Sequence, residues 1–353
     1  MDKFMRDDLK GLKPYKVDSI PYRIKMDANE SPYDLPDAIR QRLANELMRG
    51  YQFNRYPDSD ATALKEAISR YCGVSPQEVM VGAGSDELIR VVISAFVGKG
   101  DVVLYPNPSF TMYEVFTRIA GGIPIGVPLG EGFNYDMSRF YRAMEQHKPK
   151  LIFICSPNNP TGNVIHKDEL MKLVTAFNGV VVVDEAYGEF CGHSIASQMT
   201  NYPNALVLKT FSKAFGLAGL RVGYLIGNRE LIEGIYAVKP PYNVSSFSQR
   251  AAQLVLENMS IFSSRIASIV SEREWMYHKL RGFKGIEVYP SKANFLLIKV
   301  PNAQNVHKEL IREGILVRNF PNHPRLKDHL RITVSTRQDN EYFIKALERI
   351  LEG

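Results

Sequence analysis

Two runs of consecutive apolar residues most constrain what this chain can fold into. Residues 151–154 read Leu-Ile-Phe-Ile, and residues 180–183 are four valines. A strand that is apolar at every position has to be covered on both of its faces. This arrangement is typical of a parallel sheet that lies between two layers of helices. The two runs therefore predict the centre of an α/β domain.

The surrounding sequence predicts how far this domain extends. Between residues 78 and 225, short apolar runs alternate with segments of helical periodicity, which favours a doubly wound, mostly parallel sheet. Residues 244–281 contain neither Gly nor Pro and predict one or two long helices. Shorter strands and helices then follow in a smaller α+β unit. We expect an N-terminal arm outside the core (1–30), a large domain (31–245) and a small C-terminal α+β domain (246–353).

Composition argues against several other classes of protein. The chain is 45% hydrophobic and 23% charged, as in ordinary globular proteins, and no apolar run is long enough for a membrane span. The net charge of +6 is spread along the chain, which does not favour nucleic acid as a partner. The His residues form no ligand-spaced cluster, so we expect no metal site. Three cysteines without metal or redox spacing, and no apolar signal segment, predict a cytoplasmic protein.

A lysine follows another predicted strand at residues 205–208. Lys213 lies just beyond the strand end, among hydroxyls and glycines. Burial lowers the pKa of an amine, and a neutral amine can attack a carbonyl to form a Schiff base. Thr210 and Ser212 offer two hydroxyl groups and Arg221 a planar, charged guanidinium group, and these groups suit a phosphate. The alternative is a surface lysine and arginine that flank a flexible loop.

Asp184 directly follows the four valines. A carboxylate at the end of so apolar a strand needs a partner, because removing an ion from water costs several kcal/mol. A structural ion pair is one such partner, and the protonated nitrogen of a pyridine ring is another. Tyr187, three residues later, could donate a hydrogen bond to an oxygen on the same ring, or could be an ordinary core tyrosine.

Two loops at predicted strand ends carry further candidates. Gly82-Ala83-Gly84 precedes Ser85 and Asp86, and the free amides at a helix start can bind phosphate. The turn at 156–162 contains Asn159, whose amide could contact a ligand, although a rigid turn alone explains the prolines and glycine.

Three more side chains have both a functional and an ordinary explanation. Phe110 could stack on a ring or pack in the core. Arg331 interrupts an apolar strand and Arg318 follows one. Either arginine could hold a carboxylate or a phosphate, or could face outward from its strand.

Taken together, these motifs resemble one family. Asn-Asn-Pro-Thr-Gly at 158–162, Asp-Glu-Ala-Tyr at 184–187, and Ser212-Lys213 with Arg221 eight residues later are similar to pyridoxal-phosphate (PLP) aminotransferases of fold type I. Residues 27–33, 55–58, 213–224 and 331–336 resemble the histidinol-phosphate aminotransferase subgroup. The resemblance covers nearly the whole chain, in order.

The resemblance implies a role for each candidate. Lys213 would hold PLP and move a proton between substrate and cofactor. Asp184 would pair with the ring nitrogen, Asn159 and Tyr187 would bind the ring oxygen, and Phe110 would stack where the subgroup often has Tyr. The cofactor phosphate would be held by Ser85, Asp86, Thr210, Ser212, Arg221, and Tyr56 from the second subunit of a homodimer. The substrate would be held by Tyr15, Asn29, Arg318 and Arg331.

The implied activity is transamination between histidinol phosphate and 2-oxoglutarate, giving imidazole-acetol phosphate and glutamate in histidine biosynthesis. Arginine suits a site that binds both substrates in turn, because the same guanidinium group pairs with a phosphate or with a carboxylate. Decarboxylation of threonine phosphate and transamination of aromatic amino acids remain as alternatives. A dinucleotide dehydrogenase would also have the α/β pattern, but the third glycine of its fingerprint is missing.

Overall fold

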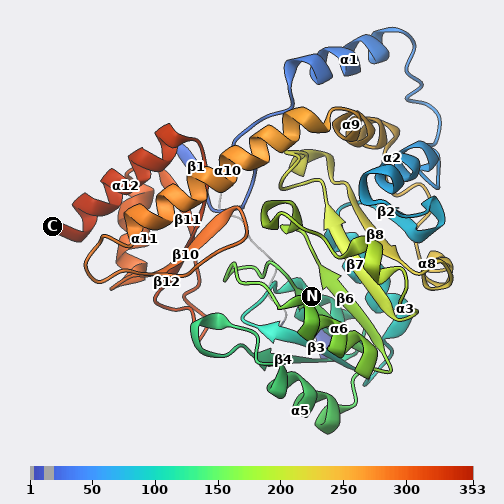
Figure 1. Cartoon of the computed structure of the whole chain (residues 1–353), viewed down its shortest axis with the longest axis horizontal. Coiled ribbons are helices and arrows are strands. Elements are labelled where there is room, and N and C mark those ends of the chain that lie inside the picture. Colours follow the sequence, from blue (N-terminus) through green and yellow to red (C-terminus); the bar gives the residue numbers. More distant parts are fainter. Residues whose placement is uncertain (1–3, 12–19, 353) are drawn as a thin grey trace.

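The computed structural model describes residues 4–11 and 20–352. Two sheets lie beside one another, and each is covered by helices (Figure 1). The larger sheet uses the middle of the chain. The smaller one uses the C-terminal part together with one short segment from near the N-terminus.

The larger sheet contains seven strands within the described residues, in the order β2-β8-β7-β6-β5-β3-β4. Only β8 runs against its neighbours, so the sheet is mostly parallel, as predicted. The strand bounds are β2 (Val79–Gly82), β3 (Val102–Asn107), β4 (Ile123–Pro128), β5 (Leu151–Cys155), β6 (Val180–Asp184), β7 (Ala205–Thr210) and β8 (Gly223–Gly227).

Both faces of this sheet are buried, which confirms the prediction from the apolar runs. Ile152 and Val181 belong to one hydrophobic cluster, and their sequence neighbours Phe153 and Val182 belong to the cluster on the opposite face. The first face is covered by α1 (Asp37–Met48), α2 (Thr62–Cys72), α5 (Met137–His147), α6 (Lys167–Ala176), α7 (Ala196–Met199) and α9 (Ser246–Glu257). The second face is covered by α3 (Ser85–Phe96), α4 (Met112–Ile119) and α8 (Arg229–Tyr236).

The smaller sheet has the strand order β1-β11-β12-β10-β9 within the described residues. Its strands are β1 (Ile24–Met26), β9 (Glu287–Val288), β10 (Phe295–Lys299), β11 (Ile315–Asn319) and β12 (His329–Thr333). Three helices pack against it: α10 (Met259–Leu280), α11 (Ala303–Arg312) and α12 (Arg337–Glu352). The predicted helical stretch at 244–281 therefore forms α9 and α10. The domain boundaries at residues 30 and 245 remain predictions.

The expectation that residues 1–30 lie outside the core is wrong for β1. Its three residues pair in parallel with β11, and Ile24 and Met26 are buried in the hydrophobic cluster of the smaller sheet. In Figure 1 this strand lies among the elements near the C-terminus. The segment was misjudged because a three-residue strand between a proline and a polar turn is too short to show a period.

The loop before β12 reaches across to the larger sheet. Arg325 Nη1 donates to the carbonyl of Leu129 at 2.7 Å, and its guanidinium lies 5.2 Å from the centre of the Phe133 ring. The ring of His323 contacts Asn107 Oδ1 at 2.9 Å, at the end of β3. These contacts fix the smaller sheet against the ends of β3 and β4, on the carboxyl edge of the larger sheet.

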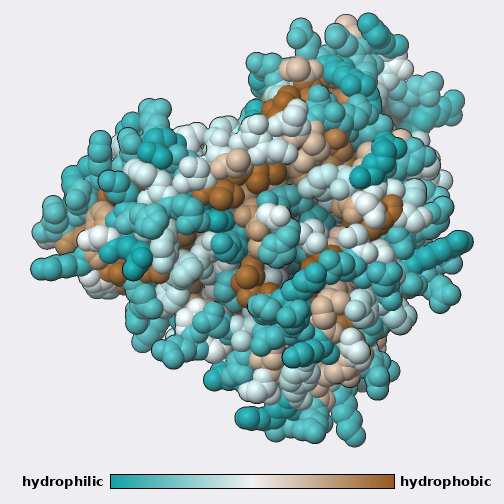
Figure 2. Space-filling model, viewed as in Figure 1, coloured by the Kyte–Doolittle hydropathy of each residue, from teal (hydrophilic) through white to brown (hydrophobic). Residues whose placement is uncertain are grey.

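Polar side chains cover most of the face shown in Figure 2, and the hydrophobic residues there form small groups. None of the helices formed by the described residues is both long and apolar enough to cross a membrane.

Candidate active site

A cavity of about 530 Å³ lies between the two sheets. It opens at the carboxyl ends of β5, β6 and β7, where ligands bind in open α/β sheets. Thirteen of the residues singled out in the sequence line it: Asn29, Ser85, Asp86, Phe110, Asn159, Asp184, Tyr187, Thr210, Ser212, Lys213, Arg221, Arg318 and Arg331.

Two predicted site residues are not among those that line this cavity. Tyr56 is 81% exposed, and its ring stacks on Tyr242 with 4.6 Å between centroids. Its predicted place at the phosphate of a neighbouring subunit remains a prediction. Tyr15 lies outside the described residues.

Lys213 lies in the turn after β7, and its amine points to the segment that follows β1. Its Nζ donates a hydrogen bond to the carbonyl of Ala28 at 2.9 Å. Burial lowers the pKa of Lys213, and the positive charge of Arg331 acts in the same direction, so that the pKa is about 8. The neutral form of this amine, which a nucleophile or a general base requires, is therefore far more populated near neutral pH than in an ordinary lysine.

Asp184 is buried at the end of β6 with two hydrogen-bond donors. The Ala186 amide donates to Oδ1 at 2.9 Å, and the Tyr113 hydroxyl donates to Oδ2 at 2.6 Å. Burial raises the pKa of Asp184 to about 6, and the bond from Tyr113 opposes this rise. The carboxylate is thus mostly ionised at neutral pH and can pair with a cation in the cavity.

Sequence reasoning missed Tyr113. It lies on α4, is fully buried, and stacks on Phe153 with 4.5 Å between ring centroids. Its edge meets the ring of Phe110 at 5.7 Å. The only signal was its place three residues after Phe110, one helical turn away, and that spacing is equally common between core residues.

The start of α3 forms an anion cradle with the turn after β7. Gly84 has φ +83°, and a Cβ there would lie 2.7 Å from Nη2 of Arg221. A Cβ on Gly223 would lie 2.7 Å from the amide nitrogen of Ser85. Both glycines are needed because backbone and guanidinium approach so closely.

The donors around this cradle suit a phosphate. The first amides of α3 have no partner within the helix, and the helix dipole favours an anion there. The hydroxyls of Thr210 and Ser212 lie 3.0 Å apart beside it. Arg221 Nη2 contacts Asp86 Oδ2 at 3.1 Å, which keeps the guanidinium at the helix start. The residues present therefore fit a phosphate group.

Asn29 connects the two sides of the cavity. It is buried with φ +53°, and its backbone amide donates to Oγ1 of Thr333 on β12 at 2.9 Å. Its side-chain amide donates to the hydroxyl of Tyr187 at 2.9 Å. Burial raises the pKa of Tyr187 to about 12, so this hydroxyl is protonated at neutral pH and can itself donate.

Two arginines stand directly opposite each other on neighbouring strands. Arg318 of β11 pairs with Arg331 of β12 in the antiparallel ladder, and both line the cavity. Arg331 is 7% exposed and donates to Asn159 Oδ1 and to the carbonyl of Asp27. Like charges facing each other across a ladder are unfavourable, and an anion in the cavity offsets the repulsion.

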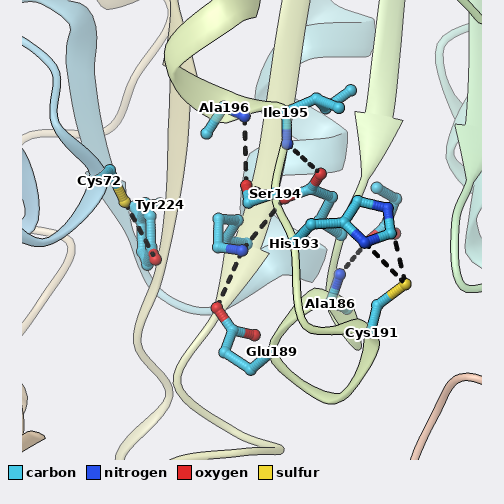
Figure 3. A network of polar contacts seen from close by, with 12 residues as sticks. Cys72, Ala186, Glu189, Cys191, His193, Ser194, Ile195, Ala196 and Tyr224 are labelled. Carbon is cyan, nitrogen blue, oxygen red and sulfur yellow. Dashed lines mark hydrogen bonds and ion pairs between the residues drawn. The ribbon is translucent and has the colours of Figure 1, made fainter. Parts of the chain in front are cut away.

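A buried cluster of charges lies next to Asp184 in the chain. Lys209 Nζ contacts Glu185 Oε2 at 3.2 Å and Glu189 Oε1 at 2.9 Å, and all three side chains are nearly inaccessible. The backbone amide of Ile195 also donates to Glu185, at 3.0 Å (Figure 3). The cluster joins the ends of β6 and β7 to the short 3₁₀-helix at Gly188–Cys191.

Comparison with known proteins finds relatives over nearly the whole chain. The sequence matches the family described as aminotransferase class I and II over residues 22–347. It is 46% identical to a histidinol-phosphate aminotransferase of Caldanaerobacter subterraneus over 351 residues, covering 99% of each chain. A histidinol-phosphate aminotransferase of Thermoanaerobacter pseudethanolicus is 47% identical with the same coverage.

Solved structures share the fold at lower identity. The histidinol-phosphate aminotransferase of Sinorhizobium meliloti, solved with pyridoxal-5'-phosphate, matches with a TM-score of 0.86 and 22% identity, covering 94% of this chain and 91% of that one. The L-threonine-O-3-phosphate decarboxylase of Porphyromonas gingivalis matches with a TM-score of 0.79 and 24% identity, covering 94% of this chain and 100% of that one. The family match and the close relatives together show that this chain belongs to the class I and II aminotransferases.

Proposed function

We propose that the protein is a PLP-dependent transaminase that moves an amino group between histidinol phosphate and 2-oxoglutarate, a step of histidine biosynthesis. One observation carries the proposal: a single cavity brings Lys213, the phosphate cradle at Arg221 and the arginine pair at Arg318 and Arg331 together. The names of the relatives at 46–47% identity support the same activity.

PLP fits the donors present in the cavity. Its phosphate would lie in the cradle formed by the start of α3, Thr210, Ser212 and Arg221. Asp184 would hold the ring nitrogen, Asn159 and Tyr187 the ring oxygen, and Phe110 one face of the ring. When bound, PLP supplies an electron sink for the bonds of the substrate carbon that carries the amine.

Three residues of the chain would carry out proton transfer and hold the charge at the ring nitrogen. Lys213 Nζ, whose pKa is about 8, would accept a proton from that carbon and deliver it to the cofactor. Asp184 stays ionised at neutral pH and holds a positive charge at the ring nitrogen. Tyr113 holds the Asp184 carboxylate in place through its 2.6 Å hydrogen bond.

The two arginines account for the alternation of substrates. The phosphate of histidinol phosphate and the side-chain carboxylate of glutamate lie at comparable distances from the carbon that carries the amine, whereas only glutamate has a second carboxylate on that carbon. Arg318 and Arg331 face each other across the ladder and can hold either anion in a bidentate contact. Asn29 would lie beside the substrate, as would Tyr15, which lies outside the described residues.

We further propose that the active unit is a homodimer, because the exposed Tyr56 ring is available to a neighbouring chain. A cytoplasmic location, and no metal and no nucleic acid among the partners, remain predictions from the sequence.

The test is product analysis with the PLP-loaded protein. Histidinol phosphate and 2-oxoglutarate should yield glutamate without carbon dioxide. Carbon dioxide release from threonine phosphate would instead identify a decarboxylase. Glutamate formation from aromatic amino acids, but not from histidinol phosphate, would identify an aromatic aminotransferase.

A further inference from the structure

A fifth basic side chain of the cavity has no part in the site as assigned so far. Lys25 lies in the middle of β1, where it pairs with Leu316 of β11. It lines the same cavity as Arg318 and Arg331, and its side chain is 28% exposed. The ammonium group is therefore accessible from the cavity and is not buried in the sheet.

The contacts of Lys25 place it close to the arginine pair. Its Nζ lies 3.6 Å from Asp27 Oδ1, and the backbone carbonyl of the same Asp27 accepts a hydrogen bond from Arg331 Nη2. Asp27 thus joins the two cations, one through its side chain and one through its backbone. Arg318 follows Val317, the β11 partner of Met26, which places it at the same end of β1.

The closest partner of Lys25 is Glu30, whose carboxylate it contacts directly. Glu30 also lines the cavity, and its side chain is 46% exposed. Burial lowers the pKa of Lys25, but the hydrogen bond to Glu30 and the charge of Asp27 outweigh this and raise it overall. The ammonium is therefore charged at neutral pH, and an ion pair this accessible to water contributes little net stability.

We propose that Lys25 is a specificity-determining residue that binds the distal anion of the substrate, and that Glu30 is an internal counter-ion which this anion displaces. The inference rests on the proposed function for the identity of the two substrates. A phosphate dianion competes better than a single carboxylate for a cation that is already paired. Displacement of Glu30 from Lys25 therefore favours binding of the phosphorylated amine over binding of glutamate.

The two residues should have opposite effects on binding, and this separates the proposal from a structural ion pair. Removing the lysine takes away a contact that the substrate makes. Removing the charge of Glu30 takes away the closer competitor and leaves Lys25 with only the longer contact to Asp27, at 3.6 Å. If the pair were purely structural, both substitutions would change substrate affinity in the same direction, because either one breaks the link between β1 and the loop that follows it.

The experiment uses the full-length, PLP-loaded protein and the variants Lys25→Gln, Glu30→Gln and the double variant. KM and kcat are measured for histidinol phosphate and for glutamate. Lys25→Gln should raise KM for histidinol phosphate about tenfold, which corresponds to one charge-assisted contact, and should raise KM for glutamate less. Glu30→Gln should lower KM for histidinol phosphate, and the double variant should match Lys25→Gln alone. Lys10→Gln, which breaks an exposed ion pair with Asp7 outside the cavity, is the matched control.

Calorimetric binding of inorganic phosphate to the same proteins, at constant ionic strength, gives a readout that needs no turnover. The affinity should fall in Lys25→Gln and rise in Glu30→Gln. A rise in KM in both single variants, or an unchanged phosphate affinity in Lys25→Gln, would overturn the proposal. If histidinol phosphate is not turned over but phosphate affinity responds as expected, the proposed function fails while the anion site stands.

Discussion

At the scale of single residues, the amine of Lys213 owes its reactivity to its surroundings. Burial and the charge of Arg331 lower its pKa from 10.5 to about 8. Below pH 8 the amine is protonated whether the chain is folded or not, and between about pH 8 and 10.5 it is neutral only in the folded protein. The free energy of unfolding should therefore gain a contribution from this group as pH rises through that window.

The chemical consequence can be measured in the protein without cofactor. An amine-specific reagent should label the peptide containing Lys213 with a midpoint near pH 8, read by mass spectrometry. The same peptide in denaturant provides the control and should titrate near 10.5. Equal midpoints in the folded and denatured samples would remove the physical basis for Lys213 as the reactive amine.

Tyr113 supplies a second prediction at this scale. Tyr113→Phe removes the hydrogen bond that keeps the pKa of Asp184 from rising above about 6. A hydrogen bond to a charged group contributes about 1.5–3 kcal/mol, so PLP affinity should fall roughly ten- to a hundredfold.

Tyr113→Phe should lose more PLP affinity at pH 6 than at pH 8. The variant raises the pKa of Asp184, so more of this carboxyl group is protonated at the lower pH. Dissociation constants for PLP at both values, measured by absorbance, check this. Asp184→Asn is the control and should bind weakly at either pH. An equal loss for Tyr113→Phe at both values would mean that Tyr113 acts through packing alone.

Residues at strand ends could be predicted from the sequence, whereas those that support them could not. Asp184 directly follows an apolar run, and Lys213 lies in the loop just beyond another, so the chain order reveals them. Tyr113 and Lys25 reach the site only through α4 packing on the sheet and β1 joining β11. Such long-range contacts leave no local pattern in a single sequence.

At the scale of elements, long periodic segments were predictable and short ones were not. The valines of β6 determined the layered architecture because all of them are buried. The three residues of β1 carry too little pattern, and their pairing with β11 brings together positions about 290 residues apart. The reversed direction of β8 also depends on tertiary pairing with β2 and β7.

The buried charges that join β6, β7 and the turn after β6 yield a stability prediction. Lys209→Met leaves Glu185 and Glu189 buried without their cation. Breaking a buried pair from one side costs about 3–5 kcal/mol, which urea unfolding of the folded variant should report. Arg229→Ala, which removes an exposed pair with Glu233, should change the free energy of unfolding by less than about 0.5 kcal/mol.

A triple variant distinguishes lost charge balance from lost packing. Lys209→Met combined with Glu185→Gln and Glu189→Gln removes both uncompensated carboxylates, so it should be more stable than Lys209→Met alone. If the triple variant is less stable still, the cluster stabilises the fold through its hydrogen bonds and shape more than through its charges.

At the scale of the whole molecule, the cavity exists only because two sheets meet. Lys213 and Asp184 come from the larger sheet, and Arg331 from the smaller one. Arg325 and its contacts to the end of the larger sheet hold the two together. A complete site, on our proposal, needs a third contribution, namely Tyr56 from another chain.

Mixing two inactive variants tests this last contribution. Lys213→Ala removes the reactive amine, and Tyr56→Ala removes the side chain that we predict to serve the neighbouring subunit. In a hybrid dimer, the site of the Tyr56→Ala chain keeps its own Lys213 and receives Tyr56 from its partner. Random reassociation of equal amounts should therefore restore roughly a quarter of wild-type activity, because half of the dimers are hybrids with one intact site.

The outcome separates the possible positions of Tyr56. If Tyr56 serves its own chain, every site in every hybrid lacks one essential group and the mixture stays inactive. If Tyr56→Ala is active by itself, the residue has no place at the phosphate. Recovery that appears only after the two proteins are unfolded together and refolded, and that is absent when they are mixed at concentrations that prevent exchange, would place Tyr56 in the site of its partner.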